Sequence, residues 1–556
     1  MITNKQLADL IFPNIKETID DLEKRYPPRD LPDGAEVTRF APSPTGFLHT
    51  GSLFTSMICR KVASQSNGVF YIRLEDTDTK REIAGSGEQL LEQLHIFGVN
   101  PDEGYLGNSE KGKYGPYVQS KRAEIYCVVI KRLLEEGKAY PCFCSSQDLE
   151  ALRDEQEKQK LNPGYYGEFA KCRNLTNEER YEKIKNGEKF VIRFRSSGNH
   201  ENKIRVSDLV RGNFEIAEND QDIVIYKSDG LPTYHFAHAV DDHFMRTTTV
   251  IRGEEWVASL PIHVELFKAL GWQAPRYAHL PVIMKIDEET GNKRKLSKRK
   301  DREAAVSYFI EDGYLPKALI MYLMTIANSN FEEWILSNHF EGMDDFVFSF
   351  KKMSLDGALF DMGKLNFFAR ELLAKMTKNE ITNLALEYSE KYNQELYKTI
   401  KNDQKYFTEI MNIDREKANP RKDYEKFGNV LEIIGYFYPD GYEKAISKGL
   451  EFNEKFNKED LVEALTAIKN ELQIGEDEQS WFSNLKDIGI KLNYAANNKE
   501  YKANPELFKG NIGDLAEILR ITLTGRKNAP SLYAVMALLG LEESHRRIDR
   551  IISLIK

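Results

Sequence analysis

The stretch R-F-A-P-S-P-T-G-F-L-H-T-G, residues 39–51, joins a short strand pattern to a helical pattern through a Pro/Gly turn, and it decides the fold. The run V-F-Y-I-R-L, residues 69–74, follows the helical pattern and is typical of a second strand. A strand, a helix and a strand in close succession predict a parallel βαβ unit. The ligand site of such a unit lies at the strand ends, beside the helix N-terminus. His49 and Gly51 fall at that place, so we expect them to meet the ligand.

Composition limits the classes of protein to consider. The chain has 556 residues, 41% hydrophobic and 30% charged, which predicts several globular domains with their own cores. No segment has the apolar length of a membrane span, and the first residues lack the basic start and apolar core of a secretory signal, so we expect a cytosolic protein with no membrane partner. The net charge of -9 gives no overall attraction to nucleic acid, but local patches of Lys and Arg can still bind phosphates.

The organisation of the chain changes near residue 286. Strand and helix patterns alternate before this point and helical patterns follow it, which predicts an α/β parallel-sheet domain followed by an all-α region. Residues 139–222 hold a polar helix, a cysteine-bearing loop and strands, and we interpret them as an α+β insertion. The predicted segments are 1–38, 39–138, 139–222, 223–285, 286–375 and 376–556, and the first of them receives no predicted function.

Two basic features predict binding of a nucleotide phosphate. A helix N-terminus offers unpaired N–H groups, the His49 imidazole can donate to a phosphate oxygen, and Gly51 lets a flat base lie against the backbone. In the second feature, K-R-K-L-S-K-R-K-D-R at 293–302, Lys295 and Lys298 can neutralise charge that develops at phosphorus. Each feature alone fits equally well with a histidine in an exposed turn or with a solvated charge run.

Together the two features resemble the HIGH and KMSKS signatures of class I aminoacyl-tRNA synthetases. His49–Ser52 stands for the first signature and Lys295–Arg299 for the second, whereas K-K-M-S-L at 351–355 lies past the basic loop and is interpreted as a chance match. The chain also resembles bacterial-type glutamyl-tRNA synthetases over about residues 39–310, which implies a Rossmann-like catalytic domain. The motifs that carry this resemblance are P-S-P-T-G at 42–46, L-E-D-T-D at 74–78, L-P-T-Y-H-F-A at 231–237 and V-I-R-G-E-E-W at 250–256.

The resemblance implies a glutamate–tRNA ligase. Such an enzyme activates L-glutamate with ATP to glutamyl-adenylate and transfers it to the 3′ end of tRNA(Glu), with release of AMP and pyrophosphate. The resemblance also implies Mg²⁺ that travels with ATP, activation that requires bound tRNA, contact of the insertion with the acceptor end of tRNA, and a KMSKS-type loop and stem-contact region at 286–375. The helical region at 376–556 is expected to bind the anticodon arm, with R-K-N-A-P-S-L-Y at 526–533 as a contact. We expect a monomer.

The same resemblance implies roles for individual residues. Two arginines can pair with the two carboxylates of glutamate, and a carboxylate and a hydroxyl can receive its ammonium group. The implied glutamate-binding residues are Arg39, Ala41, Ser43, Glu75, Tyr234, His238 and Arg252. The implied ATP-binding residues are Thr45, His49, Gly51, Ser52, Glu255, Trp256, Lys295, Ser297, Lys298 and Arg299, and the implied catalytic residues among them are His49, Gly51, Lys295 and Lys298. Which arginine takes the side-chain carboxylate stays open.

His238 departs from the family pattern, which has Asn four residues after the pocket tyrosine. Both side chains can donate to a carboxylate, so we expect glutamate binding to survive. With an ordinary pKa of about 6.5, His238 is expected to protonate in the neutral range and to make glutamate affinity fall as pH rises. The alternative is a histidine that the neighbouring backbone satisfies and that has no role in binding.

Five cysteines are too few for a disulfide framework in a chain of this length. Cys142, Cys144 and Cys172 are spaced so that three thiols could hold zinc, and some members of the family have zinc in this insertion. Structural zinc takes four ligands, and the sequence offers only Asn174 or Tyr166 near the place of the fourth. The remaining cysteines, Cys59 and Cys127, lie in helical patterns and are expected in the core.

Three other interpretations stay open. A glutaminyl-specific enzyme would share the architecture, although P-S-P-T-G and L-E-D-T-D favour the glutamate type. A shorter paralogue that glutamylates a modified tRNA base would lack the helical tail. A catalytically silent tRNA-binding protein would not need His49, Gly51, Lys295 and Lys298.

Overall fold

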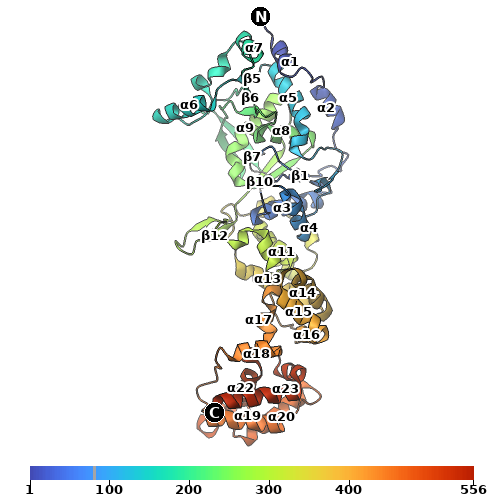
Figure 1. Cartoon of the computed structure of the whole chain (residues 1–556), viewed down its shortest axis with the longest axis vertical. Helices are drawn as coiled ribbons and strands as arrows, with labels where there is room; N and C mark the ends of the chain where they lie inside the picture. The colour runs from blue at the N-terminus through green and yellow to red at the C-terminus, as the bar shows by residue number, and fades with distance from the viewer. Residues whose placement is uncertain (45, 79–82, 298) are drawn as a thin grey trace. The chain divides into compact units, whose positions relative to one another are not determined.

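The computed structural model describes residues 1–44, 46–78, 83–297 and 299–556 (Figure 1). The chain divides into two compact units. One unit comprises Met1–Tyr308 and Ile320–Asp361, and the other comprises Phe309–Leu319 and Met362–Lys556. Among the helices of the described residues, none combines the length and the apolar character that crossing a membrane requires. The six finer segments remain a prediction.

The opening stretch forms the predicted βαβ unit. β1 (Val37–Phe40) and β2 (Val69–Ile72) are parallel, and α3 (Thr50–Gln65) joins them. All four residues of β1 are buried, as expected for a central strand of a parallel sheet. The chain then passes through α4 to a further parallel strand and a short antiparallel one; these elements are α4 (Ser86–Ile96), β3 (Glu103–Tyr105) and β4 (Glu110–Lys111).

A second parallel pair stands beside the first. β10 (Thr249–Gly253) and β11 (Arg276–Leu280) are parallel and are joined by α9 (Leu260–Leu270). β10 lies next to β1, and the Thr248 N–H donates to the Val37 carbonyl across the junction (3.0 Å). The C-terminal ends of the four strands β1, β2, β10 and β11 therefore face one region, where parallel sheets place their ligands.

The residues predicted as an insertion are mixed α and β. Within 139–222, the strands β5 (Ala139–Cys142) and β6 (Val191–Phe194) are antiparallel, and the helices α6 (Ser146–Lys158) and α7 (Asn177–Lys185) accompany them. The third strand of this sheet, β9 (Val224–Tyr226), lies just past the predicted boundary. The hairpin of β7 (Lys203–Asp208) and β8 (Gly212–Ala217) belongs to another sheet, because β7 pairs in parallel with β11. The insertion thus supplies two strands to the sheet of the catalytic half.

The N-terminal segment packs on both parts of this unit. α1 (Asn4–Ile11) contacts α7 and also α5 (Ala123–Glu135). The Ile2 N–H donates to Glu178 (2.7 Å). Within α2 (Ile19–Arg25), Glu23 accepts from the Arg246 guanidinium (2.5 Å). These contacts tie the insertion to the parallel-sheet domain at the start of the chain.

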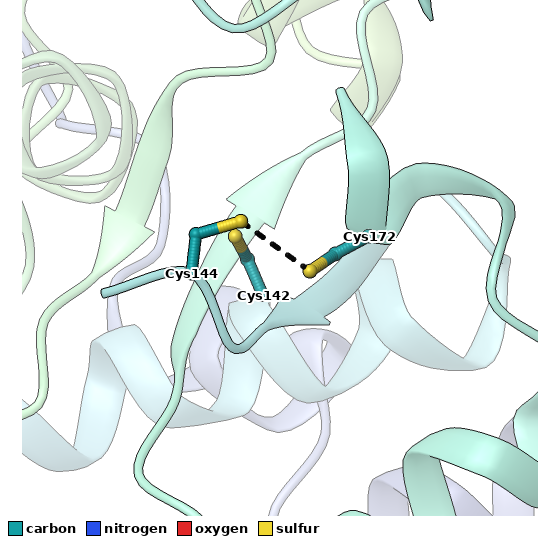
Figure 2. Close-up of side chains that lie close together, drawn as sticks. All are labelled: Cys142, Cys144 and Cys172. Atoms are coloured by element: carbon teal, nitrogen blue, oxygen red, sulfur yellow. Dashed lines mark hydrogen bonds between the residues drawn. The ribbon is translucent and has the colours of Figure 1, made fainter. Parts of the chain in front are cut away.

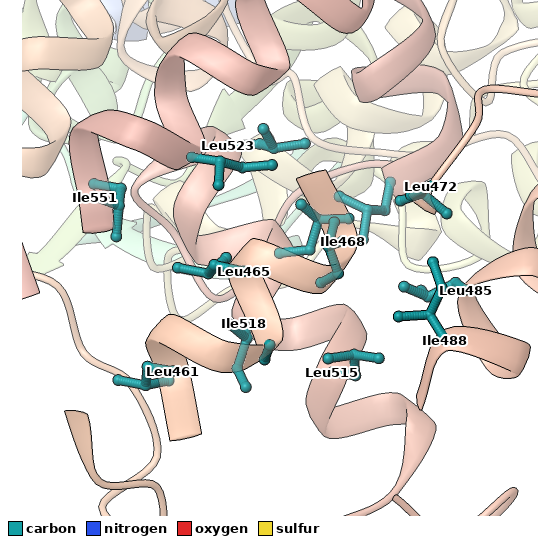
Figure 3. Close-up of a cluster of buried hydrophobic side chains, with 14 of the residues drawn as sticks. Leu461, Leu465, Ile468, Leu472, Leu485, Ile488, Leu515, Ile518, Leu523 and Ile551 are labelled. Carbon is teal, nitrogen blue, oxygen red and sulfur yellow. The ribbon is translucent and has the colours of Figure 1, made fainter. Parts of the chain in front are cut away.

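The chain after residue 300 is helical, as predicted. The hairpin of β12 (Met284–Ile286) and β13 (Lys293–Lys295) precedes it. The helices that follow up to residue 361 are α10 (Val306–Glu311), α11 (Pro316–Ala327) and α12 (Phe331–Ser337). Those of residues 362–556 are α13 (Met362–Lys375), α14 (Lys378–Tyr392), α15 (Gln394–Asn402), α16 (Gln404–Asn412), α17 (Val430–Ile434), α18 (Pro439–Ile446), α19 (Lys458–Glu471), α20 (Glu478–Lys491), α21 (Asn498–Ala503), α22 (Ile512–Thr524) and α23 (Leu532–Ile555). Apolar side chains of α19, α20, α22 and α23 meet in one buried core (Figure 3).

Candidate active site

A cavity of about 1170 Å³ opens where β1, β2, β10 and β11 end. The sequence-predicted residues that line it are Arg39, Ala41, Ser43, His49, Gly51, Ser52, Glu75, Tyr234, Arg252, Glu255, Trp256 and Lys295. His238, Ser297 and Arg299 are described but do not belong to its lining. Thr45 and Lys298 lie outside the described residues. Residues from five separated parts of the chain thus meet at the place that the βαβ unit predicts.

His49 is the N-cap of α3. Its Nδ1 accepts a hydrogen bond from the Gly51 N–H (3.0 Å), so a neutral imidazole carries its proton on Nε2. A Cβ at position 51 would lie 3.2 Å from this Nδ1, closer than ordinary contact. The first turn of α3 therefore begins at the edge of the cavity, where the positive end of the helix dipole suits an anion.

Arg39 is held by a buried carboxylate. The side chain is 4% exposed, and its Nε lies 3.2 Å from Asp242 Oδ1. Burial alone would raise the pKa of the Asp242 carboxyl, but Arg39 and Arg73 hold that pKa well below its ordinary value. Asp242 is therefore ionised, and Arg39 is fixed at the cavity wall by an ion pair that excludes solvent.

Glu75 is the buried acid of the cavity. Its Oε1 accepts from the Arg73 guanidinium (2.9 Å), which also donates to Asp242 (2.7 Å). Burial raises the pKa of Glu75, although Arg73 opposes the effect. A carboxylate in this position suits a cationic group of a ligand, because a partner charge offsets the cost of burial.

Arg252 is held by neutral rings rather than by a carboxylate. Its Nε donates to His279 Nε2 (3.0 Å), and its NH1 lies 3.2 Å from His263 Nδ1. The NH2 group donates to the Trp256 carbonyl at 3.4 Å. Among the described residues these contacts use one N–H on each guanidinium nitrogen, which leaves two of the five N–H groups for a ligand.

Tyr234 and Trp256 form an aromatic wall of the cavity. Their ring centroids are 4.3 Å apart, and burial raises the pKa of the Tyr234 hydroxyl, so this hydroxyl stays protonated. Beside them, Lys295 Nζ lies 3.9 Å from Glu255 Oε1. The wall thus joins the residues predicted for glutamate to those predicted for ATP.

The expectation that His238 titrates near neutral pH is wrong. The ring is fully buried behind Tyr234, at 4.3 Å from the ring of His263, and its Nε2 lies 3.3 Å from the Tyr277 hydroxyl. Burial lowers the pKa of His238 to about 3, even though Asp242 opposes the shift. His238 is therefore neutral at physiological pH, and the structure does not bring it into the cavity.

The basic loop is anchored at its base. The Ser297 N–H donates to Asp301 Oδ2 (2.8 Å), and Arg294 donates to the same oxygen (2.6 Å) and to Asp287 (2.7 Å). The side chains of Lys295 and Arg299 are exposed. The base of the loop is thus fixed, while the side chains of Lys295 and Arg299 reach solvent.

The sequence argument missed the residues that support the two pocket arginines. They are Arg73, Asp208, Asp242, His263 and His279, all less than 9% exposed. A weak signal was present, because Arg73 directly follows the apolar strand β2 and Asp242 is one of two adjacent acidic residues in α8 (Tyr234–Phe244). Nothing in the local pattern of Asp208 or His279 marks them.

Three cysteines converge in the insertion (Figure 2). The sulfurs of Cys142, Cys144 and Cys172 all lie within 4.8 Å of one another, and Cys144 Sγ is 3.7 Å from Cys172 Sγ. The Tyr165 hydroxyl lies 3.4 Å from the sulfurs of both Cys142 and Cys144. The neighbouring Tyr166 instead donates to the Asn162 carbonyl (2.7 Å), so Tyr165 and not Tyr166 lies beside the sulfurs.

Comparison with known proteins agrees with this geometry. The family described as tRNA synthetases class I (E and Q), catalytic domain, matches residues 36–367. The chain belongs to this family. A second family, described as an anticodon binding domain, matches residues 380–552 of this class I synthetase. These residues lie within the helical region.

Relatives extend the similarity over the whole synthetase. The glutamate–tRNA ligase of Clostridium beijerinckii is 46% identical over 99% of this chain and 100% of its own length. That of Clostridium perfringens (strain 13) is 47% identical over 98% of this chain and 100% of its own. The crystal structure of a glutamate tRNA ligase from Elizabethkingia meningosepticum in complex with its amino acid superposes with a TM-score of 0.72, at 28% identity, and covers 94% of this chain and 100% of that one.

Proposed function

We propose that this synthetase is a glutamate–tRNA ligase, which joins L-glutamate to the 3′ end of tRNA(Glu) with conversion of ATP to AMP and pyrophosphate. Relatives with this name share 44–47% identity over almost the full chain. The observation that carries the proposal is the cavity itself, which combines two buried arginines and a buried acid with the capped N-terminus of α3. Such a set suits an amino acid with two carboxylates beside a phosphate chain.

The amino acid occupies the end of the cavity near β1 and β10. Arg39 and Arg252 pair with the two carboxylates, and Glu75 with the Ser43 hydroxyl receives the ammonium group. The Tyr234 hydroxyl completes this part together with the backbone of Ala41. His238 acts from behind Tyr234 and not as a direct ligand.

ATP occupies the end of the cavity near α3 and β13. The positive end of the α3 dipole and the His49 imidazole attract the phosphate oxygens, and the base lies against Gly51. Lys295 and Lys298 neutralise charge on the phosphates. The remaining ATP contacts are Thr45, Ser52, Glu255, Trp256, Ser297 and Arg299.

The reaction needs no protein nucleophile. A glutamate carboxylate attacks the α-phosphorus of ATP in line and pyrophosphate leaves; the terminal ribose hydroxyl of tRNA then attacks the mixed anhydride and AMP leaves. One of the two arginines holds the attacking carboxylate, and the N-terminal end of α3 and the basic loop stabilise charge as it develops. Mg²⁺ enters with ATP and adds positive charge at the phosphates.

The cysteine cluster holds zinc in a structural role. Three thiols and the Tyr165 hydroxyl converge from β5, the loop after it and residue 172, which is the number of donors that structural zinc takes. Hydrogen bonds from the thiols of Cys144 and Cys172 lower the pKa of Cys142, whereas the hydrogen bonds with Cys142 and Cys172 raise the pKa of Cys144. The metal would fix the loop of the insertion.

The helical region binds the anticodon arm, and residues 526–533 supply contacts. All of them except Lys527 line two recesses of about 520 and 230 Å³, together with Phe482, Arg421 and Arg520. Aromatic rings and guanidinium groups are the surfaces on which unstacked bases lie. The enzyme works as a cytosolic monomer.

Charging of bulk tRNA with labelled glutamate or glutamine in the presence of ATP tests the proposal. Glutamate should be attached and glutamine should not. Preferred attachment of glutamine would favour the glutaminyl type, and attachment of neither would favour a silent tRNA-binding protein. A Lys298→Ala variant that charges as fast as the parent would contradict the role of the basic loop.

A further inference from the structure

The way in which Arg252 is held fixes the proton positions of two histidines. A guanidinium group can only donate, so His279 Nε2 and His263 Nδ1 must both be the unprotonated nitrogens of their rings. His279 then carries its proton on Nδ1, which lies 2.7 Å from Asp208 Oδ2. Burial lowers the pKa of both rings, in agreement with neutral imidazoles.

Asp208 holds His279 at two points. Its Oδ2 accepts from the His279 backbone N–H (3.1 Å) as well as from the ring. Its Oδ1 accepts from the N–H groups of Val210 and Arg211, both at 2.9 Å. One carboxylate, only 3% exposed, thus joins the turn of the β7–β8 hairpin to the ring that contacts Arg252.

The same turn also reaches the other side of Arg252. Arg211 forms an ion pair with Glu254, and Glu254 accepts from the Val282 N–H (3.1 Å). Glu254 lies two residues after Arg252, at the start of the segment whose Trp256 carbonyl accepts from the Arg252 guanidinium. The guanidinium is therefore bounded on two sides by groups attached to the hairpin.

We propose that Asp208 and His279 are positioning residues for Arg252, through which the β7–β8 hairpin sets the orientation of the carboxylate-binding guanidinium. The neutral ring between Asp208 and Arg252 fixes the Nε–H without placing a counter-charge in contact with the guanidinium. Arg39, in contrast, is held directly by the Asp242 carboxylate. Arg252 is therefore the pocket arginine whose charge is least offset before the ligand binds. This inference rests on the proposed role of Arg252 in glutamate binding.

The test measures KM and kcat for glutamate in tRNA charging, at saturating ATP and tRNA, for full-length variants. His279→Ala and Asp208→Asn should each raise the KM for glutamate about tenfold or more, because a charge-assisted bond is lost or misplaced, while kcat and the KM for ATP stay within about twofold of the parent. His279→Gln, whose amide oxygen can still accept from the Arg252 Nε–H, should recover most of the loss.

A double variant separates positioning from a general structural effect. If His279 acts through Arg252, adding His279→Ala to Arg252→Gln should raise the KM no further, whereas independent effects would multiply. His243→Ala is the matched control, because His243 also pairs with a carboxylate, Glu23, at 2.6 Å but lies away from the cavity lining. It should leave the KM for glutamate unchanged.

The outcomes distinguish this inference from the proposed function. An unchanged KM in Arg252→Gln would overturn the binding role of Arg252. A raised KM in Arg252→Gln with unchanged values in His279→Ala and Asp208→Asn would overturn the positioning role alone. If His279→Ala does not fold, the test rests on His279→Gln and Asp208→Asn. A KM for glutamate in Asp208→Asn equal to that of the parent would overturn the positioning role. Losses of kcat and of ATP affinity as large as the loss of glutamate affinity would overturn it as well.

Discussion

Replacement of Asp242 by Asn should destabilise the first unit strongly. Asp242 is fully buried and lies 3.2 Å from Arg39 Nε, 2.7 Å from Arg73 NH1 and 2.9 Å from His238 Nδ1. The amide keeps the size of the side chain but loses the charge that two buried guanidinium groups share. Breaking a buried ion pair from one side costs about 3–5 kcal/mol, because the remaining charge has no partner and no water.

Urea unfolding followed by tryptophan fluorescence measures this cost. For a unit of this size, a loss of 3–5 kcal/mol lowers the urea midpoint of its transition by about 1–2 M. The KM for glutamate should rise in the same variant, because Arg39 loses the group that holds it at the cavity wall. Trp256, Trp272 and Trp334 report on this unit, whereas Trp481 reports on the other.

Asp9→Asn is the matched control for Asp242→Asn. Asp9 pairs with Lys131 at 2.7 Å in the same unit but is 49% exposed, and an exposed pair contributes about 0–1 kcal/mol. A midpoint for Asp242→Asn within the range of Asp9→Asn would refute the reasoning. It would mean that the arginines find other partners or water when the carboxylate is gone.

Three further predictions concern glutamate binding and zinc. Because burial raises the pKa of Glu75, and only the ionised form holds the ammonium group, the KM for glutamate should rise as pH falls; Glu75→Gln should flatten the profile, and a parent profile no steeper than that of Glu75→Gln would contradict this. His238→Asn should leave the pH dependence of the KM unchanged between about pH 6 and 8, because His238, with a pKa of about 3, is neutral throughout; a rise with pH that disappears in the variant would contradict it. Metal analysis should find about one zinc per chain in the parent and in Cys59→Ser, and less than a tenth in Cys172→Ser, whereas a zinc-free parent would contradict the site.

The local part of the fold could be predicted from the sequence. The apolar runs that form β1 and β2, with the Pro/Gly turn before α3, specify a βαβ unit through contacts between near neighbours. The same pattern places His49 at the N-cap and Arg39 at the strand end, so part of the cavity could be predicted as well.

The support of the cavity could not be predicted in the same way. Asp242 lies 203 positions after Arg39, and Asp208 lies 71 positions before His279, so only tertiary packing brings these pairs together. The sequence also could not show that the His238 ring is covered by other residues. Its spacing of four residues from Tyr234 puts both on one face of α8, but Tyr277 and His263 cover the ring and remove it from the ligand.

The neutrality of His238 bears on the choice between glutamate and glutamine. Of the residues proposed for the amino acid, Arg39, Arg252 and Glu75 are ionised, which gives two positive charges and one negative charge and therefore a net charge of +1. Bound glutamate has two carboxylates and one ammonium group, so its net charge of -1 neutralises this set. Glutamine has one carboxylate and one ammonium group, so its net charge is zero and one buried guanidinium would keep no counter-charge. Such a charge costs several kcal/mol, so the pocket favours glutamate by electrostatics alone. A protonated His238 would raise the net charge of this set to +2, and its low pKa, about 3, prevents this at physiological pH.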